Sequence, residues 1–136
     1  MITIVPDDAS WPETFVAVAR PLRTALGELA LRIDHIVSTS VPGLAAKDII
    51  DVQVTVEDFA CMPQLMAALG PIGYTQIPEI LGDHLPPLYQ GLDTDWEKRY
   101  FRPPANQRPM HLHVRALGRP INAIPYFFAI TCVPIP

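Results

Sequence analysis

Apolar residues recur along this chain at spacings that predict two helices. The first is expected to begin at Ser10, where a serine precedes a first-turn proline and a glutamate follows three residues on, a pattern typical of a capped helix start. Apolar residues then recur every three or four positions to about Gly27. Pro21 lies inside this run and is expected to kink or divide the helix. Residues 62–69 predict a second, shorter helix that ends at a Gly-Pro pair.

Alternation with a period of two, or a short apolar run, predicts the strands. The expected strands are residues 2–5, 31–37, 49–56, 72–74, 96–102 and 110–116. Residues 78–95 are rich in proline and predict a long loop. The order of elements predicts a single domain of the α/β class (α+β type), in which a mixed sheet carries its helices on one face.

Two of these strands have a polar face. In 49–56, branched apolar residues occupy alternate positions, so Asp51 and Gln53 point to the opposite side. In 110–116, the side chains of His111, His113 and Arg115 share one face. If both faces lie on the same side of one sheet, they form the floor of a pocket.

Three of these polar residues are candidates for chemistry. A buried carboxylate needs a hydrogen bond, a cation or a metal, so Asp51 is a candidate catalytic residue and metal ligand; the alternative is a solvated position at a strand edge. His111 and His113 place their imidazoles about 7 Å apart. One metal could take both imidazoles, or they could act as catalytic acid and base and as phosphate donors. Asp51 with His113 is the expected metal pair, and the alternative is two histidines on a half-exposed face without a role.

The segment between the strands 31–37 and 49–56 contains small hydroxyl residues and a lysine. Ser38, Thr39 and Ser40 are candidates to present hydroxyl groups to a phosphate, and Lys47 to supply the positive charge. The segment lacks the GxxxxGK pattern of a P-loop, and its alternative interpretation is an ordinary turn closed by a Pro-Gly pair.

Composition narrows the class of protein. With 136 residues, 49% hydrophobic and 18% charged, the chain is expected to fold as one globular domain. A net charge of −4 argues against a nucleic-acid partner. No apolar run is long enough to span a membrane, and the start of the chain has no export pattern. Cys61 and Cys132 are therefore expected to be free thiols in the cytoplasm.

The residues named above lie in segments that resemble a known protein family. Residues 35–52, HIVSTSVPGLAAKDIIDV, closely resemble the GrpB family signature, which runs HIGSTSVPGLAAKPIIDI or nearly so. The segments WPETF, LRTALG and RPMHLHV also look like parts of that family, and the similarity covers roughly residues 2–118. The resemblance implies a fold similar to polymerase-β-type nucleotidyltransferases, in which Gly-Ser precedes a strand bearing Asp-x-Asp or Asp-x-Glu.

Carried onto this chain, the transferase pattern is incomplete. Asp51 matches the first acid, whereas Gln53 stands at the second and Val37 stands in place of the glycine. A third acid would fall near His111 or His113. Because two-metal phosphoryl transfer needs carboxylates that bridge the ions, this set is poorly suited to paired Mg²⁺ and better suited to a softer ion or a bare phosphate.

The resemblance therefore implies a GrpB-like domain that binds a nucleotide or another phosphorylated ligand in a pocket with weakened transferase motifs. The expected ligand contacts are Ser38, Thr39, Ser40, Lys47, Gln53 and Arg115. One alternative is an active metal-dependent nucleotidyltransferase that uses Asp51, His111 and His113. The other is a non-catalytic interaction or folding-helper domain.

The end of the chain departs from the family pattern. The domain is expected to cover residues 1–119, and residues 120–136 form an apolar tail with three prolines between 121 and 136. The family usually continues here as an amphipathic helix of the type NxRYxLLFRDYLRAHP. Shifting the back-translated frame by one nucleotide permits such a helix, which leads to the hypothesis of a frameshift near codon 120. The uncharged run at 126–135 predicts strand addition, self-association or aggregation; the alternative is that it covers the exposed core.

Overall fold

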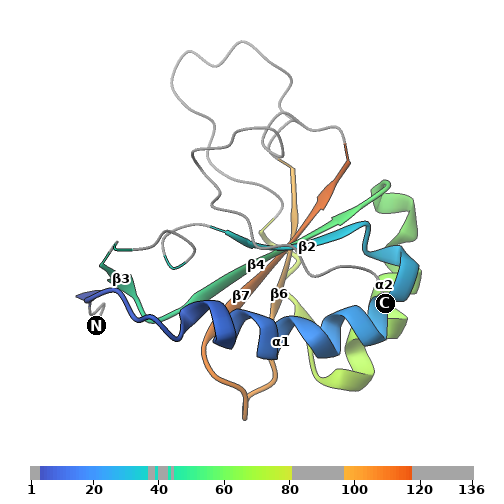
Figure 1. Ribbon diagram of the computed structural model, residues 1–136. Coiled ribbons are helices and arrows are strands. Elements are labelled where there is room, and N and C mark those ends of the chain that lie inside the picture. The colour runs from blue at the N-terminus through green and yellow to red at the C-terminus, as the bar shows by residue number, and fades with distance from the viewer. Residues whose placement is uncertain (1–3, 37–38, 40–42, 44, 81–96, 118–136) are drawn as a thin grey trace.

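A computed structural model describes residues 4–36, 39, 43, 45–80 and 97–117 of the chain (Figure 1). Within them the helices and strands are β1 (Ile4–Val5), α1 (Trp11–Leu26), β2 (Arg32–Ile36), β3 (Ala46–Lys47), β4 (Ile50–Val56), α2 (Met62–Leu69), β5 (Thr75–Gln76), β6 (Arg99–Arg102) and β7 (Met110–Ala116). Short 3-10 helices occur at Gly27–Leu29, Phe59–Cys61 and Gly70–Ile72.

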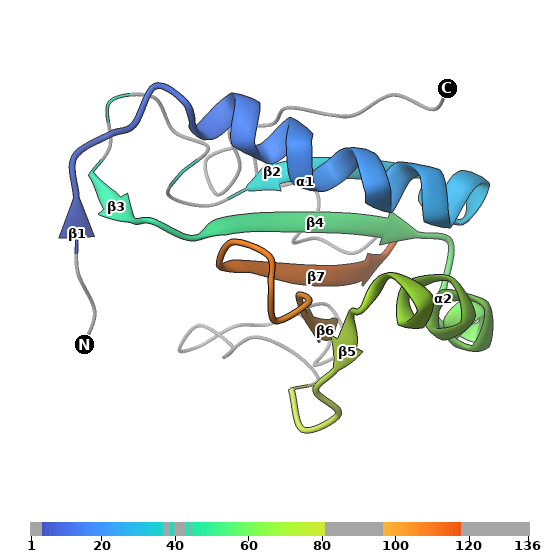
Figure 2. The same ribbon diagram turned by 90° about the horizontal axis from the view of Figure 1, so that it is seen from below.

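Five of the strands form one mixed sheet in the order β2-β4-β7-β6-β5. The central pair β4 and β7 is parallel, and the other neighbours are antiparallel. Figure 2 shows these strands side by side in that order. β1 does not join them: it pairs with β3 in a separate two-stranded antiparallel sheet beyond the start of β4. The N-terminal strand therefore supports the segment that leads into β4.

Both helices pack on the same face of the five-stranded sheet (Figure 1). α1 runs along β2 and β4, and α2 packs against α1. The apolar stripe of α1 and the alternate apolar residues of the strands are buried there. The largest fully buried side chains include Trp11, Phe15, Leu22, Ile33, Ile50, Val52, Leu65, Leu69, Phe101 and Leu112. Each such burial contributes about 1.5–3 kcal/mol to folding. The predicted fold class, a mixed sheet with helices on one face, is confirmed.

Two details predicted for α1 are not found: division of the helix at Pro21 and capping by the Ser10 side chain. Pro21 does not divide the helix, which runs without interruption from Trp11 to Leu26. Proline removes one backbone hydrogen bond, and buried side chains on both sides of it, among them Val18 and Leu22, hold the helix against the sheet. Ser10 does not cap the helix with its side chain; its hydroxyl instead donates to Asp8 Oδ1 at 2.7 Å.

The strand predicted at residues 72–74 is also misplaced. Gly70–Ile72 is a 3-10 helix, and the strand is β5, at Thr75–Gln76. Gly73 lies between them with φ of +93°, a left-handed conformation that turns the chain and that side chains rarely adopt. Of the predicted proline-rich loop, residues 81–95 lie outside the described part of the chain, as does the whole tail 120–136.

Candidate functional site

The register of the two central strands aligns their polar residues. β4 and β7 pair in parallel with Asp51 opposite His111 and Gln53 opposite His113. These residues lie on the side of the sheet away from the helices, since the residues that alternate with them are in the helix-covered core. The polar faces of the two strands thus form one surface, which we call the polar face.

At the centre of the polar face, three side chains form a chain of hydrogen bonds. His113 Nε2 lies 3.0 Å from Asp51 Oδ1, and both side chains are largely buried. On the other side of the imidazole, Lys98 Nζ lies 3.2 Å from His113 Nδ1. Lys98 comes from the residue before β6, so three neighbouring segments of the sheet each contribute one group.

The partners of His113 determine its protonation. An ammonium group has only protons to donate, so Lys98 donates to Nδ1 and the ring proton lies on Nε2, from which it is donated to Asp51. Burial lowers the pKa of His113, and the carboxylate of Asp51 opposes that shift. His113 is therefore a neutral imidazole between a cation and an anion.

The second histidine of the polar face has a different partner. The Tyr100 hydroxyl is hydrogen-bonded to His111 Nδ1, and Tyr100 comes from β6. Burial, followed by the nearby charge of Asp51, raises the pKa of Tyr100. The phenol therefore keeps its proton and can donate it. With the phenol as donor to Nδ1, the ring proton of His111 lies on Nε2.

A pocket of about 300 Å³ opens beside these residues. Its polar lining comes from Lys47 of β3, Asp51 of β4 and His111 of β7. Its apolar lining comes from Ile4, Ala45, Ala46 and Ile49. The pocket thus lies where the small β1–β3 sheet meets the first residues of the two central strands.

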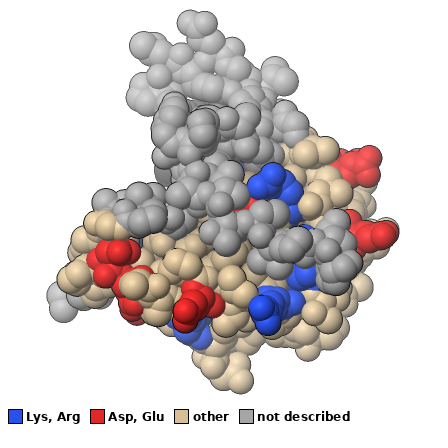
Figure 3. All heavy atoms as spheres, viewed as in Figure 1, with Lys and Arg blue, Asp and Glu red and all other residues tan. Residues whose placement is uncertain are grey.

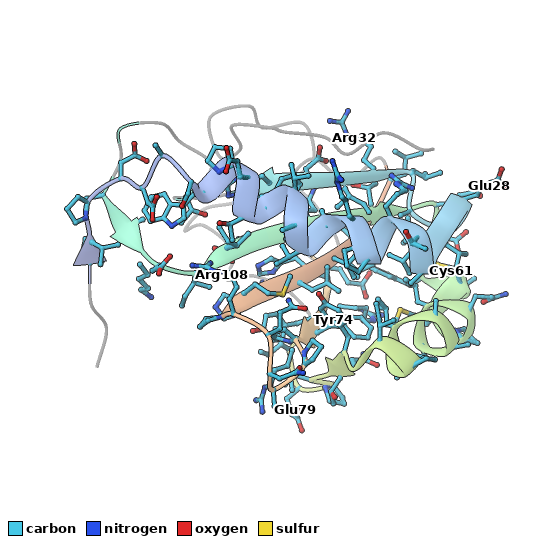
Figure 4. All side chains as sticks on the ribbon, turned by 60° about the horizontal axis from the view of Figure 1, so that its bottom comes forward. Glu28, Arg32, Cys61, Tyr74, Glu79 and Arg108 are labelled. Carbon is cyan, nitrogen blue, oxygen red and sulfur yellow. The ribbon has the colours of Figure 1, made fainter. Side chains whose placement is uncertain are left out.

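A second hydrogen-bond network is centred on Asp48, the residue after Lys47. The Asp48 carboxylate accepts from the buried Trp11 Nε1 at 2.9 Å and from Arg108 at 2.5 Å. The hydrogen bond from Trp11, with that from Arg108, lowers the pKa of Asp48. Figure 4 shows Arg108 on the segment that leads into β7, close to the start of β4. Asp48 directly follows Lys47, so the network ties the lysine's strand to α1 and β7.

The other candidate ligand contacts differ in their surroundings. Gln53 Oε1 accepts from Arg115 Nε at 3.1 Å, and both residues are buried. The Thr39 hydroxyl lies 2.9 Å from His35 Nε2 and 3.4 Å from the carbonyl of Ile49. None of these side chains lines the pocket. Ser38 and Ser40, together with Val37, lie outside the described residues.

A divalent metal ion needs several ligand side chains close together. Among the described residues, no three His, Cys, Asp or Glu side chains come together as a group that could hold one. Asp51 and His113 do lie together, but the nitrogen that faces the carboxylate carries the ring proton. An ion held between the two groups would have to displace that proton, so the metal role of Asp51 and His113 stays a prediction.

Sequence reasoning missed two members of this site, Lys98 and Tyr100. Neither residue has a role in the predictions made from the sequence. The available signal was the alternation in 96–102, because Lys98 and Tyr100 lie on the same face of a strand that is antiparallel to β7.

The surface charge does not form a one-sided patch in the view of Figure 3. Among the described residues, basic and acidic side chains are interspersed over the face shown there. None of the described helices has the length and apolar character that a membrane crossing requires.

The fold and the site together define a class: an α+β domain of nucleotidyltransferase-like topology, with a single acid on its central strand. The particular family follows from comparison with known proteins. Residues 1–128 match the family described as "GrpB protein". The chain therefore belongs to the GrpB family.

A solved structure and curated proteins resemble this chain. The crystal structure of conserved protein GrpB from Enterococcus faecalis superposes with a TM-score of 0.68 at 31% identity, covering 89% of this chain and 66% of that one. The UPF0157 protein BH1888 of Halalkalibacterium halodurans is 36% identical over 118 residues, which are 86% of this chain and 53% of that protein.

A dephospho-CoA kinase of Mycolicibacterium paratuberculosis is 35% identical over 131 residues. The match covers 88% of this chain but 32% of the kinase. The chain thus spans about a third of the length of that relative.

Proposed function

We propose that this GrpB domain binds a small phosphorylated ligand, a nucleotide or another phosphate ester, in the pocket beside Asp51. The observation that carries the proposal is the position of Lys47, which lines the same pocket as Asp51 and His111. An ammonium group beside an imidazole N–H is a suitable donor set for phosphate oxygens.

The charges around the pocket support this assignment. The chain has a net charge of −4, yet the polar face carries Lys98, Arg102 and Arg115 against Asp51. Asp34, on β2, is paired with Arg32 at 2.9 Å and adds no net charge. Among the described residues of this face, cations therefore exceed anions, which favours an anionic ligand.

Gln53 and its partner Arg115 favour ligand binding over transfer chemistry. Gln53, which stands at the second acid position of the transferase pattern, accepts a hydrogen bond from Arg115. A glutamine in that role cannot bridge two ions as a carboxylate does. An active metal-dependent nucleotidyltransferase remains the alternative that the experiment below is designed to detect.

A third function is favoured by one comparison. The relative named dephospho-CoA kinase contains the similar segment within about a third of its length. A GrpB segment in a longer chain is compatible with an interaction or folding-helper domain that takes no small ligand. The kinase activity itself is not carried over, because this chain lacks the GxxxxGK pattern.

Calorimetric titration with ATP, GTP and CTP tests these functions. Each nucleotide is added with Mg²⁺, with Mn²⁺ and with a chelator, to the unchanged chain and to Lys47→Ala. We expect binding that does not require metal and that weakens about tenfold to a hundredfold in Lys47→Ala, because a charge-assisted hydrogen bond is lost.

The matched control is Arg20→Ala, which removes one exposed cation from α1, away from the pocket. Its nucleotide affinity should equal that of the unchanged chain. Binding that needs Mg²⁺ or Mn²⁺ would favour the transferase, and absence of binding to all three nucleotides would favour the interaction domain.

A further inference from the structure

The pocket contains a carboxylate as well as donors, and this mixture restricts its ligand further. Asp51 uses one oxygen, Oδ1, to accept from His113, and no other described residue donates a hydrogen bond to this carboxylate. Because the carboxylate also lines the pocket, it is an acceptor available to whatever the pocket holds.

The orientation of Asp51 is set by the chain of contacts behind it. Lys98 holds the proton of His113 on Nε2, and that proton holds Oδ1. The carboxylate is thus fixed as a hydrogen-bond acceptor by groups that lie outside the pocket lining. A ligand group that meets Asp51 must therefore be a donor.

Among the described residues, the other two polar groups that line the pocket, Lys47 and His111, are donors. Lys47 is exposed, and its ammonium makes no hydrogen bond with the described residues. With Tyr100 as donor to Nδ1, His111 carries its ring proton on Nε2 and is a donor there. Both groups suit an anion, whereas Asp51 repels one. Of the three polar groups that the described residues contribute, a bare phosphate would satisfy two and be opposed by the third.

The volume of the pocket and its aliphatic lining restrict the class of ligand further. Four aliphatic residues line it, so part of the ligand is hydrocarbon: Ile4, Ala45, Ala46 and Ile49. The volume of about 300 Å³ lies at the lower limit for ligand sites, which suits a unit the size of one short or cyclic polyol and its phosphate.

From this arrangement we infer that the pocket recognises a phosphorylated polyol, with Asp51 accepting from a ligand hydroxyl while Lys47 and His111 donate to its phosphate. This inference rests on the proposed function, since it names the class of phosphate ester that the pocket takes. The ribose phosphate of a nucleotide belongs to the same class.

A matched pair of small ligands isolates the hydroxyl contact. Glycerol 3-phosphate and n-propyl phosphate have the same carbon number and the same charged group, and they differ by two hydroxyls. Dissociation constants are measured for both by ¹H–¹⁵N chemical-shift titration, with inorganic phosphate as a third probe. We expect glycerol 3-phosphate to bind the unchanged chain about tenfold more tightly than n-propyl phosphate, because a hydroxyl–carboxylate hydrogen bond is gained.

Asp51→Asn should shift the ligands in opposite directions. Asparagine keeps an oxygen that accepts from His113, so the fold is preserved and the thermal midpoint should be close to that of the unchanged chain. The loss of negative charge weakens the hydroxyl contact and removes the repulsion of the phosphate. Glycerol 3-phosphate should therefore bind several-fold more weakly, and inorganic phosphate several-fold more tightly.

Different experimental results would overturn the polyol inference and the proposed phosphate binding. If both esters bind equally, lose affinity in Lys47→Ala and respond alike to Asp51→Asn, the polyol inference is overturned and phosphate binding stands. If nucleotides bind but neither small ester does, the inference is again overturned. If neither the esters nor the nucleotides bind, both proposals are overturned.

Discussion

The two faces of the five-stranded sheet are built from the same strands but held together by different forces. On the helix-covered face, alternate residues of β4 and β7 are apolar and fully buried, and α1 and α2 pack on them. On the polar face, the intervening residues are joined in specific pairs, such as Asp51 with His113 and Gln53 with Arg115.

The difference indicates how a site of this kind is kept in place. Apolar burial is large and non-directional, so it fixes the strands without specifying which polar residues meet. Hydrogen bonds are smaller in net free energy but directional, and they orient each group on the strands that the core has already fixed. Stability and recognition are therefore carried by opposite faces, and substitutions can separate them.

The largest effect is expected from the helix-covered face. Leu22→Ala removes a fully buried side chain of α1 and should lower the free energy of unfolding by about 2–5 kcal/mol. Urea denaturation followed by circular dichroism measures this loss. The control is Met66→Ala on α2, where the side chain is 44% exposed and the expected loss is below about 1 kcal/mol. Equal losses in the two variants would contradict the assignment of the core.

A smaller effect on stability is expected from His35, which lies on the helix-covered face. His35 stacks on Phe15 with ring centroids 4.9 Å apart, and burial lowers its pKa from 6.5 to about 4. Above pH 6.5 the group is neutral in both states and adds no pH dependence. Between pH 6.5 and pH 4 the unfolded chain binds a proton that the folded chain does not, so stability falls as the pH falls.

The expected loss from this group is about 3 kcal/mol at most, and it is complete below pH 4. Denaturation midpoints measured from pH 7.5 to pH 4 test it against His35→Gln, whose amide can still donate to Thr39 but does not titrate. The variant should lose less stability on acidification. A pH profile that is the same in both proteins would exclude His35 as the source, and would leave His113, whose pKa is also lowered by burial.

The smallest effect is expected from a buried pair on the polar face. Gln53→Leu leaves Arg115 Nε without the acceptor that lies 3.1 Å away, and should lower the free energy of unfolding by about 1–3 kcal/mol. Gln53→Glu keeps an acceptor at the same place and serves as the matched control, with stability close to that of the unchanged chain. Both are compared by urea denaturation. Loss of equal size in the two variants would mean that side-chain shape, rather than the hydrogen bond, matters at residue 53.

Much of this architecture was predictable from local patterns. The period of two in residues 49–56 and 110–116 assigned each side chain to a face, and β4 and β7 follow that assignment. The apolar stripe of α1 predicted its buried side correctly because helical periodicity depends only on neighbouring residues. The segment 35–52 pointed to the family that the comparisons show.

The errors arose where packing outweighed a local preference. Pro21 lies within an unbroken helix because buried residues on both sides of it hold α1 on the sheet. The strand expected at 72–74 gave way to a 3-10 helix and a left-handed Gly73, since the chain must turn there before β5 can pair with β6. The residue pattern within one segment does not show which strand that segment will pair with.

By itself, the sequence determined both helices, the two central strands, the sidedness of Asp51, His111 and His113, and the resemblance to one family. Only the tertiary structure decided which of these groups meet. The parallel register of β4 and β7 brings together residues about 60 positions apart, and β6 adds Lys98 and Tyr100 beside the histidines. Periodicity is a property of neighbouring residues, whereas strand order and register follow from how the whole core packs, so the partners of Asp51 could not be read from the chain alone.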